Sequence, residues 1–237
     1  MDGWLSADPF TDAAKGGGVM AEVELLAALP KTKRNIEKRK AAKDPDVIRM
    51  AKEYGELYFD GPRDYGYGGY RYDGRWLPVA RDMVAHFNLK PGDRVLDIGC
   101  AKGFLVKDLM QVCPGLEVFG MDISTYALTH CEPEVVGRLH LGSGDALPFP
   151  DHSFHAVVSL NTIHNFSRDR AIVAMQEIQR VSGGHAFVQV DSYHTPKDKE
   201  VFESWVLTAE FHDYPSGWKQ LFNEAGYTGD YYWTVIT

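Results

Sequence analysis

The chain has 237 residues and an ordinary apolar fraction, which suits one α/β domain with an N-terminal extension. Its formal charge of −8 argues against nucleic acid as the main partner, because binding to phosphates requires a cationic surface. The three cysteines form no Cys-x-x-Cys pair, so we expect no disulfide framework and a reducing compartment. The sequence has no apolar run of about 18 residues and no signal-peptide pattern, so we expect a cytoplasmic protein without a membrane partner.

The N-terminal part of the chain is predicted to form a helical cap. Residues 1–20 are rich in Gly, Ala and Asp and are expected to be a flexible tail. The pattern becomes helical from residue 21, and residues 31–43 hold seven cations and one acid. That run could bind an acidic partner, but in an acidic chain it is more typical of a solvated helix face. We predict helices and a lid loop within residues 21–76.

The segment 58–76 interleaves aromatic residues with glycines and follows neither a helical nor a strand period. Glycines lose much conformational entropy on folding and bury no side chain, so many of them in one segment indicate a special backbone shape. We predict that this segment forms a lid or pocket wall, with Tyr67, Tyr70 and Tyr72 as lid contacts. The alternative is a surface loop whose tyrosines pack on the core.

Residues 94–106 organise the rest of the chain. The apolar run at 95–98 is typical of a strand buried in a parallel sheet, and a turn bracketed by Gly99 and Gly103 follows it. The turn lacks the glycine and lysine spacing of a phosphate loop. It also lacks the Gly-x-Gly-x-x-Gly of a dinucleotide site, and an acid, Asp97, stands inside the strand end. An ordinary strand–glycine–helix connection is the remaining alternative.

A second short strand, predicted at residues 117–122, also ends in an acid. Asp122 follows Asp97 by 25 residues, which is the length of one strand–helix–strand unit. An ionised carboxylate offers only hydrogen-bond acceptors, so at this position it can bind both hydroxyls of a ribose. We count Ile123, the next residue, with the ligand-binding residues. The alternative is a solvated aspartate at a strand end.

A third stretch begins with Gly144, Asp145 and Ala146 and continues as Leu-Pro-Phe-Pro-Asp-His-Ser-Phe-His. Together the three stretches resemble the class I S-adenosylmethionine-dependent methyltransferases. The first matches the family's Asp/Glu-x-Gly-x-Gly-x-Gly motif, with Ala101 in place of the middle glycine. The third resembles the family's Gly-Asp-Ala-x-x-Leu-Pro-Phe-x-Asp-x-Ser-Phe-Asp run, although its spacer is shorter and His155 stands where Asp is usual.

The resemblance implies a cofactor and the residues that hold it. S-adenosylmethionine would be the methyl donor and S-adenosylhomocysteine the product. The methionine end would lie on the first turn, the ribose on Asp122, and the adenine on the Asp145 carboxylate and the Ala146 N–H. The predicted cofactor-binding residues are Asp97, Gly99, Cys100, Gly103, Asp122, Ile123, Asp145, Ala146, Asn161, Tyr67, Tyr70 and Tyr72.

Candidate catalytic residues follow the fourth and fifth predicted strands. His164 comes shortly after the fourth strand, and Asp191 ends the fifth. Ligands of open α/β sheets bind beyond the carboxyl ends of the strands, so both side chains are expected near the methyl acceptor. We predict His164 as a general base with Asp191 behind it. The alternative is a structural histidine, because many methyl transfers require only positioning.

The predicted fold is a doubly wound α/β domain over residues 77–237, with the mostly parallel, seven-stranded sheet that the resemblance implies. The predicted function is methyl transfer to an oxygen or nitrogen of a small polar metabolite, as in bacterial sugar or natural-product pathways. An NAD-dependent oxidoreductase and a non-catalytic cofactor-binding protein are the alternatives. No metal is expected, because the carboxylates are dispersed and no histidine pair has ligand spacing. A homodimer is allowed, and the acceptor stays open.

Overall fold

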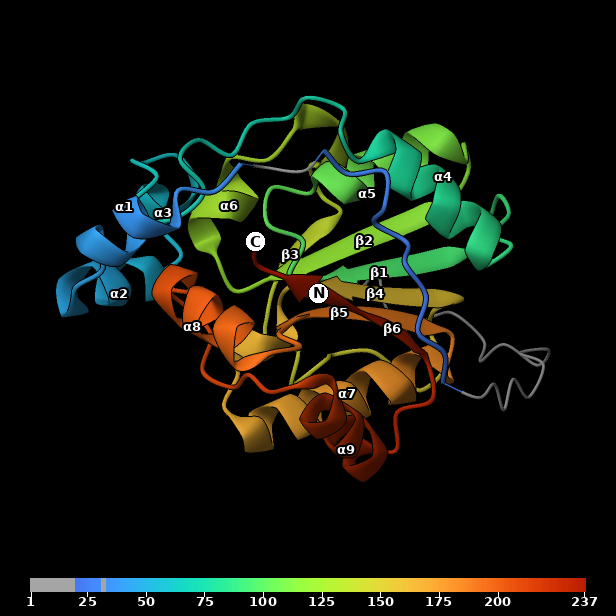
Figure 1. The fold of residues 1–237 in the computed structure, drawn as a ribbon. Helices are drawn as coiled ribbons and strands as arrows, with labels where there is room; N and C mark the ends of the chain where they lie inside the picture. Colours follow the sequence, from blue (N-terminus) through green and yellow to red (C-terminus); the bar gives the residue numbers. More distant parts are fainter. Residues whose placement is uncertain (1–19, 31–32) are drawn as a thin grey trace.

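A computed structural model describes residues 20–30 and 33–237 and shows a sheet with helices on both faces (Figure 1). In this part of the chain the sheet has six strands in the order β3-β2-β1-β4-β5-β6, and all neighbouring strands are parallel. The predicted α/β fold is confirmed, although six strands are seen where seven were expected. The strands are β1 (Arg94–Ile98), β2 (Glu117–Asp122), β3 (Leu139–Leu141), β4 (Ala156–Leu160), β5 (Ala186–Ser192) and β6 (Asp230–Val235).

Helices α4 and α5 cover one face of the sheet, and α7 and α9 cover the other (Figure 1). Helices α1, α2, α3 and α8 lie beyond the carboxyl ends of the strands, where α1 packs against α8. The helices are α1 (Ile36–Ala42), α2 (Pro45–Lys52), α3 (Glu56–Phe59), α4 (Leu77–His86), α5 (Phe104–Val112), α6 (Thr125–Thr129), α7 (Arg168–Ser182), α8 (Pro196–Trp205) and α9 (Pro215–Ala225), with 3-10 turns η1 (Pro133–Val135) and η2 (Ile163–Asn165).

The alternation of side chains along β1 divides the core between the two faces. Val95 packs among the residues of α4 and α5, whereas Leu96 and Ile98 pack among those of α7 and α9. Successive side chains of a strand point to opposite faces, so Asp97 lies on the same face as Val95. This strand therefore buries apolar groups on both sides and brings one acid to its carboxyl end.

The N-terminal segment pairs with the edge strand β6 at Tyr231. Glu22 forms a parallel bridge with Tyr231, the Val23 N–H donates to the Tyr231 carbonyl at 3.0 Å, and the Tyr231 N–H donates to the Ala21 carbonyl. The helical pattern expected from residue 21 is wrong for the described residues, which first form a helix at Ile36. Backbone partners along β6 outweigh the weak helical periodicity of this segment. The predicted tail lies outside the described residues, apart from Met20.

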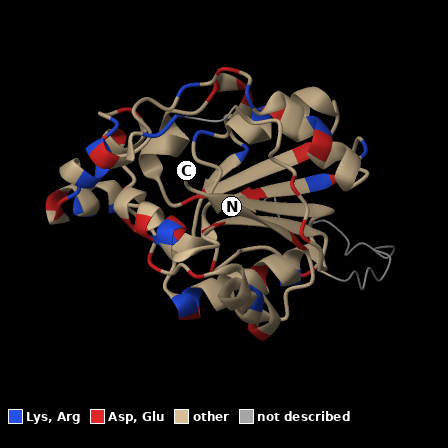
Figure 2. Ribbon diagram, viewed as in Figure 1, with Lys and Arg blue, Asp and Glu red and all other residues tan. Residues whose placement is uncertain are grey.

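Charge is distributed unevenly over the cap. Lys and Arg gather on α1 and α2, mixed with acids, at the left of Figure 2.

Within the described residues, no helix combines the length and the apolar character that a bilayer crossing needs.

Replacing Val23 by proline removes the N–H that donates to the Tyr231 carbonyl. We expect V23P to lower the free energy of unfolding by about 1–3 kcal/mol, because the carbonyl loses its partner at the sheet edge. Urea unfolding checks this. V23A keeps the N–H and should cost clearly less; equal losses would show that the side chain, and not the backbone pairing, matters.

Candidate functional site

A cavity of about 280 Å³ opens at the carboxyl ends of β1, β2 and β4. The strand ends supply its floor, and the segment before α4 supplies aromatic side chains above it. Its lining consists of Tyr54, Tyr58, Phe59, Tyr67, Ile98, Gly99, Ala101, Met121, Asp122, Ile123, Gly142, Ser143, Gly144, Leu160, Asn161, Thr162, Asn165, Phe166 and Arg170.

The turn after β1 has no room for a larger side chain. Gly99 has a φ of 81°, and a Cβ there would lie 1.9 Å from the Thr162 hydroxyl oxygen. Ala101 has a φ of 50°, which is a left-handed conformation that favours glycine. Its N–H donates to the Asp122 carboxylate at 2.8 Å. The alanine therefore keeps the backbone path of the glycine that the resemblance expects here.

Asp122 is held rigidly on the cavity wall. One carboxylate oxygen accepts the Ala101 N–H, and the other accepts the Ser124 N–H at 2.8 Å. Each oxygen keeps a further lone pair for a ligand hydroxyl. Ile123, beside it, is 54% exposed and also lines the cavity, so an apolar ring could cover it. Both residues, which the sequence analysis counted as cofactor-binding, therefore lie on the cavity wall.

Asp97 lies behind this wall with 4% of its surface exposed. Its carboxylate has no hydrogen bond or ion pair with any residue that the structure describes. Burial raises its pKa to about 7, and the charge of Asp122 adds to the rise. A buried carboxylate without a partner is costly, and a cationic ligand group would offset that cost.

The predicted adenine-binding pair is occupied by the protein's own groups. The Asp145 carboxylate accepts from Arg170 at 2.6 Å and from the Ser143 hydroxyl, and the Ala146 N–H donates to the Ser143 carbonyl at 3.1 Å. Neither predicted residue lines the cavity, whereas Ser143 and Arg170 do. The adenine roles of Asp145 and Ala146 stay predictions, and in this structure the Asp145 carboxylate is paired with Arg170.

The three predicted lid tyrosines have different surroundings. Tyr67 lines the cavity. Tyr70 lies outside the lining and stacks on Phe104, with 4.7 Å between ring centroids. The Tyr72 hydroxyl donates to Asp108 on α5 at 2.7 Å, away from the cavity. Only Tyr67 is therefore placed for ligand contact, and the other two attach the loop to the domain.

The lid is also attached to the turn after β1 by an ion pair. The Lys102 ammonium, 6% exposed, donates to the Asp60 carboxylate at 2.6 Å, and the Tyr126 hydroxyl donates to the same oxygen at 2.8 Å. The other Asp60 oxygen accepts the Tyr70 N–H. Asp60 thus connects the lid, α6 and the cofactor turn.

His164 and Asp191 form a buried pair beside the cavity rather than on its wall. His164 Nδ1 accepts the Asp191 N–H at 3.2 Å, and its Nε2 lies 3.6 Å from the Asp191 carboxylate. Burial lowers the pKa of His164 and raises that of Asp191. The His164 carbonyl accepts from Glu210 and Phe211. Both ring nitrogens face groups of the protein, an arrangement that fixes the loop.

The remaining predicted residues divide in the same way. Asn161 lines the cavity with a φ of 53°. Cys100 is 5% exposed and outside the lining, and burial raises the pKa of its thiol. Gly103 caps the start of α5, where a Cβ would lie 2.9 Å from Leu139. Cys100 and Gly103 therefore shape the turn.

The sequence analysis missed several residues that line the cavity. Tyr54 comes from the loop after α2, Phe166 directly follows η2, and Arg170 lies in the first turn of α7. Nothing in their local sequence indicates a ligand, because their position depends on how the helices cross the strand ends. Asn165, in the loop after β4, also lines the cavity, and its buried side-chain carbonyl oxygen has no hydrogen-bond partner among the described residues.

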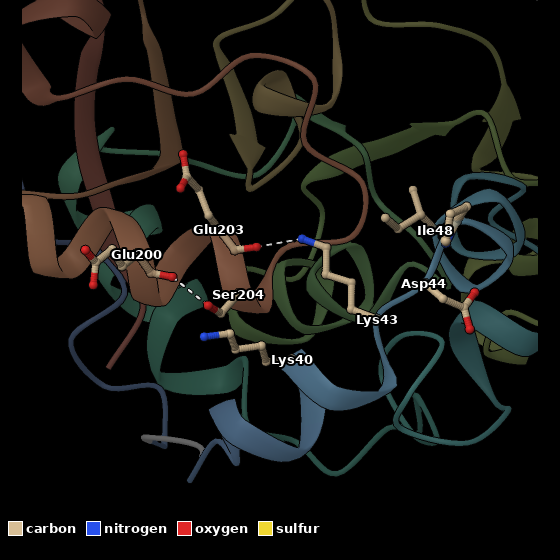
Figure 3. Close-up of a pocket in the computed structure, with 8 residues that line it drawn as sticks. Lys40, Lys43, Asp44, Ile48, Glu200, Glu203 and Ser204 are labelled. Atoms are coloured by element: carbon tan, nitrogen blue, oxygen red, sulfur yellow. Dashed lines mark hydrogen bonds between the residues drawn. The ribbon is translucent and has the colours of Figure 1, made fainter.

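A second hollow, of about 500 Å³, lies on the outside of the cap between α8 and the α1–α2 corner (Figure 3). Charges of both signs line it, and the Lys43 ammonium is bonded to the Glu203 carbonyl at 2.6 Å. The strand ends contribute nothing to it, so it is not assigned to the site.

Among the described residues, no group of three His, Cys, Asp or Glu side chains could hold a metal ion.

Comparisons with known proteins agree with this geometry. The Methyltransferase domain family matches residues 96–221. A Symbiobacterium thermophilum demethylmenaquinone methyltransferase is 37% identical over 35% of this chain and 37% of its own length. A Mus musculus protein named probable tRNA methyltransferase 9B is 36% identical over 62% of this chain and 31% of its own. The chain thus spans only about a third of these relatives.

Solved structures share the fold at lower identity. A chain from the complex of the Haloferax volcanii Trm112 methyltransferase activator with a methyltransferase is 18% identical, with a TM-score of 0.53 over 83% of this chain and 77% of that one. A Bacillus halodurans protein assigned as a methyltransferase is 20% identical, with a TM-score of 0.51 over 62% and 68%.

S-adenosylmethionine, the methyl donor of the family, fits the residues of the cavity. The buried carboxylate of Asp97 suits its cationic methionine end, and Asp122 with Ile123 suits its ribose and purine. The matched motifs, the fold and this cavity lead to one conclusion. The chain belongs to the class I S-adenosylmethionine-dependent methyltransferase family.

Proposed function

We propose that the protein transfers the methyl group of S-adenosylmethionine to an oxygen or nitrogen of a small polar metabolite, such as a sugar or natural-product intermediate. The observation that supports this most is the cavity at the strand ends, with Asp97 behind it and Asp122 and Ile123 on its wall. One relative is named for tRNA, but the formal charge of −8 favours a small acceptor. The oxidoreductase alternative is set aside, because the chain belongs to a methyltransferase family.

The sulfonium supplies an activated methyl group, so the protein's part is to align the acceptor and to exclude water. Asp97 would bind the cationic end of the donor, and Asp122 would accept from the ribose hydroxyls. Tyr67 would close the cavity from the lid. We also propose that residues 21–76 form a cap over the domain of residues 77–237. Nucleic acid and membranes are not proposed as partners. A homodimer is compatible with this arrangement of cap and domain.

For His164, the geometry supports positioning over proton removal. Its ring is buried, and both ring nitrogens face Asp191. The base role stays a prediction for this pair. Replacement of His164 by Asn separates the two roles: a lost pH dependence would indicate a base, whereas a uniform loss of rate with an unchanged pH profile would indicate positioning.

Calorimetry with S-adenosylmethionine and S-adenosylhomocysteine tests the proposed function. We expect both to bind, and we expect D122A to weaken both by about 10-fold or more, since hydrogen bonds to a charged group are lost. Failure of both ligands to bind the folded chain would contradict the proposal. Binding without transfer to any acceptor of a metabolite panel would support the non-catalytic alternative.

Replacing Asp97 by Asn should stabilise the ligand-free protein while weakening the cofactor. The folded pKa of about 7 exceeds the ordinary value, so the folded state holds the extra proton between about pH 4 and 7. The free energy of unfolding therefore falls as the pH rises through that window. Above it, the ionised Asp97 lowers the free energy of unfolding by its full amount.

The shift corresponds to a cost on the order of 2–4 kcal/mol at pH 8. In urea unfolding, D97N should gain about that much at pH 8 and little at pH 4.5. The control D82N removes an exposed acid of α4 and should show no such pH dependence. A D97N variant that is less stable than the natural protein at pH 8 would sink this account.

Replacing Lys102 by Met keeps the buried stem and removes the charge that binds Asp60. We expect a loss of about 1–3 kcal/mol in unfolding free energy, because Asp60 is partly exposed and water can replace part of the pair. The cofactor should also bind less tightly, since the lid is released. Hydrogen exchange over residues 58–72 checks the mechanism, with K90M as a surface control. Unchanged protection in K102M would rule out the attachment.

A further inference from the structure

Three arginines surround one tryptophan between α1 and α8. The guanidinium carbons of Arg39, Arg63 and Arg34 lie 4.5, 5.1 and 5.8 Å from the ring centroid of Trp205. Arg39 is 4% exposed, Arg34 is half-buried and Arg63 is exposed. We call these three side chains the arginine cluster. Cations stack favourably on an indole, but one ring does not neutralise three charges.

Within the described part of the chain, none of the three arginines forms an ion pair with a carboxylate. The nearby Asp64 carboxylate pairs with Lys38 at 3.9 Å and acts on Arg39 only through its charge. Burial lowers the pKa of Arg39 and the charge of Arg63 lowers it further, while the charge of Asp64 opposes this fall without reversing it. Like charges held together cost free energy, and an anion between them would reverse the sign of that interaction.

The hydrogen bonds of the cluster leave donors available. Arg39 and Arg63 both donate to the Gly66 carbonyl at 3.1 Å, and Arg63 also donates to the Tyr67 carbonyl at 2.7 Å. These bonds fix two of the guanidinium groups. A guanidinium has five N–H donors, and Arg34 forms no hydrogen bond with any described residue. The planar donor fork of arginine matches a carboxylate or a phosphate.

The cluster lies on the acceptor side of the cavity. Arg63 is bonded to the backbone of Tyr67, whose side chain lines the cavity. Arg34 is close enough to Asp191, at the carboxyl end of β5, for its charge to oppose the rise in the pKa of that carboxyl. Trp205 ends α8, which lies beyond the strand ends with α1 (Figure 1).

We infer that the arginine cluster binds an anionic group, a carboxylate or a phosphate, carried by the methyl acceptor. The inference rests on the proposed function and deepens it: the acceptor is a small anion whose nucleophile reaches the cavity past Tyr67. None of the three arginines lines the cavity itself, so the cluster is separate from the donor's binding residues.

The test is a titration of the full chain with inorganic phosphate and with acetate, at constant ionic strength and with saturating S-adenosylhomocysteine. We expect saturable binding to the natural protein and a loss of about 10-fold or more in R34Q, since a charge-assisted hydrogen bond is removed. R34K should restore part of the affinity. R81Q removes an exposed arginine of α4 and should bind like the natural protein.

Four results would overturn the inference. They are no saturable phosphate or acetate binding, equal binding by R34Q and R81Q, competition between phosphate and S-adenosylhomocysteine, and a short RNA that binds far more tightly with a steep salt dependence. The titration is repeated without S-adenosylhomocysteine. If S-adenosylhomocysteine does not bind but phosphate or acetate does, the proposed function fails. If S-adenosylhomocysteine binds but neither phosphate nor acetate does, only this inference fails.

Discussion

The desolvation of two neighbouring carboxylates is the constraint on which the site depends. Asp97 is the next-to-last residue of β1 and Asp122 is the last residue of the adjacent parallel strand β2, and the register places Asp97 beside Gly120 and not beside another charge. Burial raises the pKa of both, and only Asp122 receives backbone N–H groups that compensate it. The ligand-free protein therefore bears an electrostatic cost at the place that we propose for the cationic methyl donor, and binding of that cation would offset the cost.

The cap completes this arrangement from the other side. Its aromatic side chains cover the strand ends, and Asp60 attaches it to the cofactor turn through Lys102. Three arginines of the same cap, the arginine cluster, gather at Trp205 and bring positive charge there. Carboxylates thus lie at the end of the site where we propose that the donor binds, and guanidinium groups lie at the end that we propose for the acceptor. Such a difference in charge would orient the two ligands relative to each other.

Much of the fold was predictable because it is local. The buried strand at 94–98, the turn after it and the spacing from Asp97 to Asp122 all follow from short-range patterns. The edge of β6 was not predictable, since residues 21–23 and 231 pair across the whole chain. For the site, the sequence named Asp122, Ile123 and Tyr67, which line the cavity. It could not pair Tyr72 with Asp108, or Arg170 with Asp145, because these contacts depend on helix packing.

The covered edge of β6 also limits how two copies could associate. Unpaired strand edges are templates for pairing with another chain, and proteins protect them by covering them or keeping them short. Here residues 21–23 occupy one edge of the sheet, and at the other edge β3 has only three residues. Within the described residues, both features shorten the row of free backbone groups at the sheet edges. A second copy that paired with β6 would therefore have to displace residues 21–23 from Tyr231.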